Sequence, residues 1–311
     1  MRKSLSLLVS IFLLFLASPL ASAESSVVRI TSTVHQNFTG EFVNDDLVQE
    51  LTPSGKLGQL VFTPFVKSKI WAIDPALIDE VVAMTGEYTL VEGAVPGGKE
   101  ISLAWLTQLK EITTDNEVIA LAYGNPDVAL AKRLAPSELR AYFAYGKTAL
   151  ELALGRAVRS EPNQRWSTGT AKLSSDLSRN YGDTRKDLTR LSRVVTSPDL
   201  EKLRMSLGRL LSPSLDFENR TALSLNARSA VDAEVRKLRI VPGKYQLTTE
   251  AASLPVTVIN DFPVEITVNV RMAAGNARII VDSFTGVILP PLSKLQLELN
   301  AFVIAPGQTV V

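Results

Sequence analysis

Residues 69–75 read KIWAIDP, and a segment of the same kind, EVIALAYGNPD, follows at residues 117–127. Each segment begins with a short apolar run and ends at an aspartate beside a proline. Apolar runs of roughly four to eight residues bounded by turn residues are typical of strands buried in a parallel sheet. Residues 76–84, between the two runs, carry apolar side chains at helical spacing. This alternation predicts β-α-β units in the N-terminal half of the chain.

Further short elements are predicted around these two strands. Residues 87–92 (EYTLVE) are expected to form a short strand, followed by a turn at residues 96–98 (PGG). Ser102 is expected to cap a helix over residues 102–112, because leucines recur there on one face. Helices are also predicted over residues 127–134 and 137–159, with a boundary at Pro136.

The next region, residues 160–239, is polar and rich in serine and arginine. Residues 160–182 show little periodicity, so we expect a long loop there. A helix start is indicated at Ser197-Pro198-Asp199, which supplies a cap, a proline at the first helical position and an early acid. A further helix is predicted over residues 217–238. Because acids are interspersed with the arginines, these helices are expected to expose solvated faces.

From residue 241 onward, alternation and β-branched runs predict an all-β region. Short strands at close spacing favour an immunoglobulin-like β-sandwich, although such sandwiches usually have about seven strands and five are visible here. Either the sandwich is minimal or it is truncated. We favour truncation, because the chain stops at TVV (309–311), inside a possible further strand. The strands are expected over residues 245–249, 256–259, 264–271, 278–281 and 295–304.

The first 23 residues have the features of a cleavable signal peptide. Arg2 and Lys3 provide a positive start, residues 5–17 an apolar core, and Ala21-Ser22-Ala23 a small-x-small cleavage pattern. The core is shorter than the roughly 20 residues that span a bilayer, so cleavage before Glu24 is favoured over anchoring. We therefore expect an exported protein, extracellular or in the cell envelope. No second apolar run of membrane-spanning length follows in the mature chain.

The predicted fold class is thus α/β plus all-β. We expect an α/β domain over residues 24–159 that resembles part of a (β/α) barrel. A loop and helical connector over residues 160–239 and a C-terminal immunoglobulin-like β-sandwich over residues 240–311 complete the mature chain.

Composition excludes several kinds of chemistry. The chain has no cysteine and a single histidine, His35. Disulfides, thiol nucleophiles and a zinc site built from several histidines are therefore excluded, and no metal is expected. Residues 93–98 contain three glycines but lack the order of a phosphate-binding loop, so no cofactor is expected. Without Arg2 and Lys3, the 33 basic residues fall to 31 against 32 acidic ones, which gives no reason to expect nucleic acid as a partner.

Asp74 and Asp127 are the candidate catalytic residues. Each follows a predicted parallel strand, and the carboxyl edge of such a sheet is where ligands and catalytic groups gather. Two carboxylates facing one cleft can act as acid and base, as in glycoside hydrolysis. The simpler interpretation is structural, because Asp74 precedes Pro75 in the pattern of a helix cap.

Three further residues are candidate ligand-binding positions. Tyr123 and Asn125 lie at the same predicted strand end as Asp127. Trp166 stands in a polar stretch, whereas Trp71 and Trp105 occupy apolar elements and are expected in the core. His35 has no recognisable serine partner, and the chain contains no G-x-S-x-G motif, so a structural role is favoured for it.

Five short motifs stand out along the chain: WAIDPALI at 71–78, AWL at 104–106, AYGNPDV at 122–128, PGKY at 242–245 and LPVTVIN at 254–260. These motifs resemble a family of exported actinobacterial proteins of unknown function. The resemblance covers most of residues 40–135 and 240–305. It implies a signal peptide, a barrel-like α/β region distantly similar to polysaccharide deacetylases, a β-sandwich and usually a C-terminal membrane anchor.

The chain departs from that family in two ways. It has too few predicted strands for an eight-stranded barrel and lacks the anchor. It also has only His35 where the deacetylase metal site requires an H-x-x-x-H pair, so the resemblance implies a location and a fold but not that activity. The favoured function is a non-enzymatic protein that binds a cell-wall polymer or an envelope protein. The alternatives are a metal-independent carbohydrate-active hydrolase using Asp74 and Asp127, and a fragment with no independent role.

Overall fold

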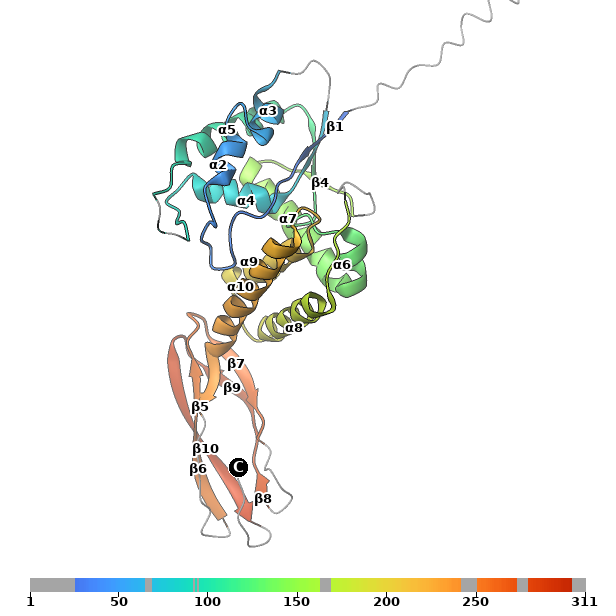
Figure 1. The fold of residues 1–311 in the computed structure, drawn as a ribbon. Helices are drawn as coiled ribbons and strands as arrows, with labels where there is room; N and C mark the ends of the chain where they lie inside the picture. Colours follow the sequence, from blue (N-terminus) through green and yellow to red (C-terminus); the bar gives the residue numbers. More distant parts are fainter. Residues whose placement is uncertain are drawn as a thin grey trace, which may run out of the picture.

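A computed structural model describes residues 26–64, 69–91, 93, 95–162, 169–241, 251–272 and 279–303. The described chain is a mixed α/β protein, as predicted: an N-terminal parallel sheet with helices, a helical region, and a C-terminal antiparallel region (Figure 1). In Figure 1 the last helix, α10 (Phe217–Arg236), leads directly into the first strand of the C-terminal region, β5 (Leu238–Val241).

The N-terminal sheet has four parallel strands in sequence order, β1-β2-β3-β4. Ile30, Ile73 and Ala120 are neighbours in register, so the carboxyl ends of the first three strands lie at one edge. The strands are β1 (Ser26–Ile30), β2 (Lys69–Ile73), β3 (Glu117–Ala120) and β4 (Arg159–Ser160). The helices among them are α2 (Asp46–Leu51), α3 (Lys56–Phe62), α4 (Pro75–Met84), α5 (Lys99–Ile112), α6 (Val128–Leu134) and α7 (Pro136–Leu154).

The strands predicted at residues 69–74 and 117–123 are confirmed as β2 and β3, although β3 ends earlier than predicted. The helix predicted at residues 76–84 is confirmed as α4. The predicted strand at residues 87–92 is wrong for the described part, where only Leu90 forms a single bridge with Phe42. Ser102 is not a cap: α5 begins three residues earlier after Gly98, and Ser102 is buried inside the helix. The helix expected to reach residue 159 stops at Leu154, because Gly155 adopts the left-handed conformation that ends helices.

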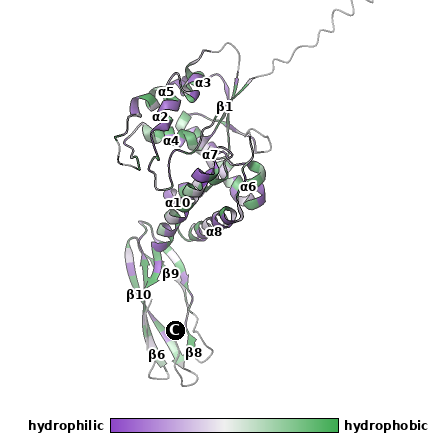
Figure 2. Cartoon of the chain, in the orientation of Figure 1, coloured by the Kyte–Doolittle hydropathy of each residue, from purple (hydrophilic) through white to green (hydrophobic). Residues whose placement is uncertain are grey.

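The helical region contains α8 (Ser175–Leu191), α9 (Pro198–Ser206), the short 3₁₀ helix η1 (Leu207–Leu211) and α10. The start of α9 at Pro198 and nearly all of α10 agree with the prediction, but the side chain of Ser197 makes no capping hydrogen bond. The long loop predicted over residues 160–182 is wrong at its end, since α8 begins at Ser175. Most of α8 is hydrophilic (Figure 2), and its buried face consists of a few apolar residues, among them Leu177, Tyr181 and Leu188. Leu177, Tyr181, Leu188 and Leu191 nevertheless recur at helical spacing, so the sequence carried a signal for this helix that the loop prediction overlooked.

The C-terminal region contains a four-stranded antiparallel sheet and a two-stranded one. The larger sheet has the order β5-β6-β10-β8, with β6 at Ala251–Asn260, β8 at Ile279–Val281 and β10 at Ser293–Val303. The smaller sheet pairs β7 (Ile266–Val270) with β9 (Phe284–Leu289). Strands β5 and β9 were not predicted. The strand predicted at residues 245–249 lies outside the described residues.

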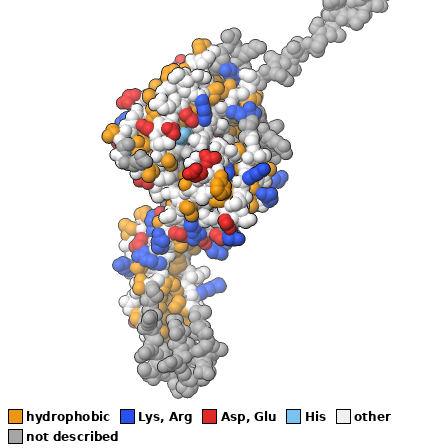
Figure 3. Space-filling model, viewed as in Figure 1, with side chains coloured by type: hydrophobic (Ala, Val, Ile, Leu, Met, Phe, Trp, Pro, Cys, Tyr) orange, Lys and Arg blue, Asp and Glu red, His pale blue; other side chains and the backbone are white. Residues whose placement is uncertain are grey.

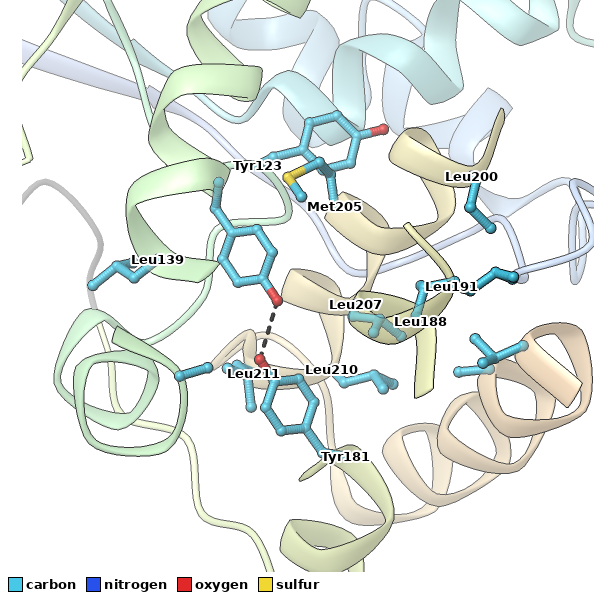
Figure 4. Packing of buried hydrophobic residues seen from close by; sticks show 14 of the residues in the cluster. Tyr123, Leu139, Tyr181, Leu188, Leu191, Leu200, Met205, Leu207, Leu210 and Leu211 are labelled. Atoms are coloured by element: carbon cyan, nitrogen blue, oxygen red, sulfur yellow. Dashed lines mark hydrogen bonds between the residues drawn. The ribbon is translucent and has the colours of Figure 1, made fainter. Parts of the chain in front are cut away.

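One hydrophobic cluster joins all three regions. It contains Tyr123 after β3, Leu188 of α8 and Leu210 of η1 (Figure 4). Val231 of α10 and Phe262 after β6 belong to the same cluster. A second cluster fills the space between the parallel sheet and α2 to α5, with Trp71 and Trp105 in it as predicted. Within the described residues, none of the helices has the length and apolar character needed to cross a membrane.

Candidate functional site

A small pocket lies at the carboxyl edge of the parallel sheet. Its walls come from the loop after β1, the start of α4, the turn after β3 and η1, so it draws on segments far apart in the sequence. Asp74, Glu80 and Arg209 are its charged residues, and we call these three the charge cluster. The lining residues are Ser32, Thr33, Val34, Asp74, Ala76, Leu77, Glu80, Gly124, Arg209 and Ser212.

Asp74 is buried at the point where β2 gives way to α4. Its Oδ1 accepts hydrogen bonds from the backbone N–H of Ala76, at 3.0 Å, and of Gly124, also at 3.0 Å. The first bond is the predicted helix cap, and the second ties the cap to the turn after β3. Burial raises the pKa of Asp74 to about 7, against the lowering effect of these bonds and of Arg209. Asp74 is therefore both a structural cap and a pocket residue.

Glu80 is the second pocket carboxylate, and sequence reasoning missed it. It projects from α4 and accepts the backbone N–H groups of His35, at 3.4 Å, and Gln36, at 3.3 Å. Burial raises the pKa of Glu80 to about 7, while Arg209 and these two N–H groups act in the opposite direction. A signal was available in the sequence: Glu80 lies three residues after Leu77 and four before Met84, on the buried face of α4.

Arg209 connects η1 to the N-terminal sheet. Its Nη1 donates to the carbonyl oxygen of Gln36 at 3.2 Å and lies 3.3 Å from Oε1 of Glu80. The guanidinium also stands over the ring of Tyr123, with 5.8 Å between its Cζ and the ring centroid. Its Nε is buried without a hydrogen-bond partner. Nothing in the local sequence of residues 207–211 indicates this role, because the partners of Arg209 are remote along the chain.

Close backbone approach shows that η1 closes this edge of the sheet. A Cβ atom on Gly124 would lie 2.7 Å from the backbone nitrogen of Arg209, and one on Gly208 would lie 2.6 Å from the carbonyl oxygen of Tyr123. Arg220 of α10 fastens the end of η1, donating to the carbonyl oxygens of Leu210 and Ser212. The pocket left beneath is small, and its charged groups are mostly bonded to the protein itself.

Asp127 is a helix cap and does not line this pocket. Its Oδ1 accepts from the backbone N–H of Ala129 and Leu130, at 2.9 and 3.2 Å, and its Oδ2 accepts from that of Ala171 at 2.9 Å. Both carboxylate oxygens are therefore used by the backbone. The structure brings Asp74 together with Glu80 and Arg209, and places Asp127 at a separate helix start.

The three candidate ligand-binding residues have different positions. Tyr123 is fully buried and donates its hydroxyl to Oδ2 of Asp79 at 2.7 Å, so it belongs to the core. Burial raises its pKa well above the ordinary value. Asn125 is buried with a φ of 44° and an unpartnered Oδ1, next to Gly124. Trp166 lies outside the described residues.

His35 belongs to a second polar group beside the pocket. The Oγ of Ser32 lies 3.3 Å from its Nε2 and donates to Oε2 of Glu50 at 2.5 Å, while Lys56 donates to Ser32 at 3.0 Å. The serine and the carboxylate therefore approach the same ring nitrogen. A catalytic triad requires them on opposite nitrogens. Burial lowers the pKa of His35, which favours a neutral imidazole and the structural role predicted for it. Within the described residues, no cluster of three or more His, Cys, Asp or Glu is placed to hold a metal ion.

A wider hollow lies between α8 and α10, but its charges neutralise one another. Asp187 pairs with Arg190 at 3.2 Å and with Arg228 at 2.8 Å, and Lys186 pairs with Asp183 at 3.4 Å. Around the helical region in Figure 3, basic side chains likewise lie beside acidic ones. This surface agrees with the solvated helix faces expected from the sequence.

Comparison with known proteins gives a family match. The family model described as "Family of unknown function (DUF6049)" matches residues 128–311. The matched part begins at α6 and includes Arg209, whereas Asp74 and Glu80 lie before it. No curated protein matches the chain.

Proposed function

We propose that this chain, which belongs to the family of unknown function DUF6049, is an exported cell-envelope protein that binds a wall polymer or another envelope protein without changing it chemically. The observation that carries the proposal is the closure of the sheet edge by η1. An enzyme of parallel α/β architecture needs that edge open to its substrate. Here Arg209 and Gly208 occupy it, packed against Gly124 and Tyr123.

Export is supported by the N-terminal sequence. Arg2 and Lys3, the apolar residues 5–17 and Ala21-Ser22-Ala23 together match a signal peptide cleaved before Glu24. The resemblance of residues 40–135 and 240–305 to exported actinobacterial proteins supports the same location. It implies an α/β region distantly similar to polysaccharide deacetylases, whose H-x-x-x-H metal motif cannot be formed with the single histidine of this chain.

The finer fold assignments belong to the same proposal. Four parallel strands that neighbour one another in sequence order are what part of a (β/α) barrel would present. Two antiparallel sheets with buried residues from both in one cluster are what a small immunoglobulin-like sandwich would present. We propose that the sandwich-like region supplies binding surface and the α/β region supplies a rigid base.

The hydrolase alternative has weaker support. It requires Asp74 and Asp127 to face one substrate, yet both oxygens of Asp127 accept backbone N–H groups and Asp127 does not line the pocket. Asp74 has a pKa raised toward that of a general acid, but it is only 5% exposed and shares its small pocket with Arg209.

The test uses purified residues 24–311 incubated with intact cell wall. Co-sedimentation of the protein and release of soluble sugar are measured in the same tubes. We expect sedimentation without sugar release. Release that disappears in Asp74→Asn, while the thermal midpoint is retained, would overturn the proposal in favour of a hydrolase. Absence of both signals would exclude the wall polymer and leave either an envelope protein as the partner or a fragment with no independent role, which cross-linking in the envelope fraction would distinguish.

A further inference from the structure

The charge cluster contains one positive group and two negative ones. Asp74, Glu80 and Arg209 are 5%, 2% and 3% exposed. An uncompensated charge so far from water is costly, and buried groups take up or lose a proton rather than remain unpaired. The guanidinium of Arg209 stays protonated and balances one carboxylate. The second carboxylate lacks a countercharge within the cluster.

The neighbouring basic groups do not supply one. His35 from the loop before α2 is neutral, because burial lowers its pKa, and only its backbone N–H reaches Glu80. Lys56 of α3 pairs with Glu50 at 3.2 Å. Lys202 of α9 lies 3.9 Å from Asp79, the aspartate that also accepts the hydroxyl of Tyr123.

The remaining titratable neighbours add no positive charge either. Tyr123 and Tyr145 stay neutral, because burial raises the pKa of each, that of Tyr145 to about 12. Asp79 of α4 is an acid, and its charge opposes ionisation of Asp74. None of these neighbouring groups therefore supplies the positive charge that would balance the second carboxylate of the charge cluster.

We propose that Asp74 and Glu80 hold one proton between them in the folded protein, and that this proton is part of the latch that docks η1 onto the parallel sheet. The latch is the set of contacts that Arg209 makes with Glu80 and Gln36, together with the packing of Gly124 against Arg209. With the proton present, the cluster is electrically balanced and the latch is closed. When the proton leaves, two buried carboxylates face one guanidinium, and η1 is held less tightly.

The pH window follows from the two protonation states. Burial raises the pKa of Asp74 and of Glu80 to about 7, against about 4 in an unfolded chain, and the two carboxyls titrate as a coupled pair. Because Arg209 balances one carboxylate, the pair takes up a single proton in this range. The folded protein therefore binds more protons between about pH 4 and pH 7. Its stability falls as pH rises across that window, and the loss is complete above the folded pKa. This device does not depend on what the protein binds.

The experiment measures chemical denaturation between pH 5 and pH 8 for the wild type, Glu80→Gln and Glu138→Gln. The variant Glu80→Gln leaves one carboxylate with one guanidinium, so it removes the extra proton. For each proton the unfolding constant of the wild type rises up to about tenfold per pH unit. We expect the ratio of the variant's unfolding constant to that of the wild type to fall as pH rises.

Glu138→Gln is the matched control. Glu138 is also a buried helical glutamate, but it faces Arg204 alone, with bonds of 2.9 and 2.6 Å. The ratio of its unfolding constant to that of the wild type is expected to stay constant across the same pH range. Parallel curves for the wild type and Glu80→Gln would overturn the proposal.

A spectroscopic measurement keeps the proposal testable if Glu80→Gln does not fold. The infrared carbonyl stretch of a protonated carboxylic acid is expected in the wild type at pH 6 and lost above pH 8. It should be absent from Asp74→Asn at pH 6, because the remaining carboxylate is balanced by Arg209. No such band in the wild type at pH 6 would contradict the shared proton.

Discussion

Gly124 and Arg209 touch so closely that a Cβ atom on the glycine would lie 2.7 Å from the backbone nitrogen of the arginine. Gly124 also has a φ of 79°, in the left-handed region that glycine tolerates, and it donates its N–H to Asp74. One residue therefore meets a conformational, a steric and a hydrogen-bonding requirement of the same edge.

Gly124→Ala is expected to destabilise the protein strongly. The left-handed conformation alone costs roughly 1–3 kcal/mol for a residue with a side chain, and the clash with Arg209 adds to it. Gly155→Ala is the control, because Gly155 has a φ of 72° and a Cβ atom added there would meet no other atom within 4 Å. The free energy of unfolding, measured in denaturant, should fall more for Gly124→Ala. Equal losses would mean that the contact with Arg209 contributes nothing.

Asp127→Ala is expected to cost more than an ordinary cap substitution. It removes the acceptor for two N–H groups of α6 and for the N–H of Ala171. Loss of a helix cap typically costs about 1 kcal/mol, with a range of about 0.5–2. Ser174→Ala, which removes a cap bonded to Leu177 alone, gives the reference value. A smaller effect at Asp127 than at Ser174 would contradict this assignment.

Arg204→Met is expected to destabilise the chain through the carboxylate that it leaves behind. Glu138 is 1% exposed and accepts two bonds from Arg204. Removing one partner of a buried ion pair costs roughly 3–5 kcal/mol. Because Arg204 is itself partly exposed, we expect the lower end of that range. Arg179→Met, which breaks an exposed pair with Asp176, should change the thermal midpoint very little.

The buried hydroxyl pair Tyr142–Tyr181 joins α7 to α8 (Figure 4). The two oxygens are 3.0 Å apart. Each single Tyr→Phe change leaves one buried hydroxyl unpaired, which costs roughly 1–3 kcal/mol, whereas replacing both partners is close to neutral. A double-mutant cycle on the unfolding free energy measures this coupling. Additive effects of Tyr142→Phe and Tyr181→Phe would show that the hydroxyls do not depend on each other.

Local patterns predicted β2, β3 and the Asp74 cap because their causes are local. The apolar runs that become the two strands and the cap of α4 rest on residues a few positions apart. The same local view failed at α8 and at β4. The many polar residues of α8 obscured apolar residues that recur at helical spacing on its buried face, so that signal was local but overlooked. Strand β4 has only two residues, paired with β3, and tertiary packing decides such an element.

The sequence by itself determined that an α/β region is followed by an all-β region, because short-range periodicity carries that information. Its composition and first residues also determined the signal-peptide features and excluded thiol chemistry and sites built from several histidines. It also pointed to Asp74. Only the tertiary structure decided that its partners are Glu80 and Arg209 rather than Asp127. The reason is physical: the charge balance of a buried site depends on which remote segments fold over it. Here η1, far along the chain, brings the one guanidinium that two carboxylates share.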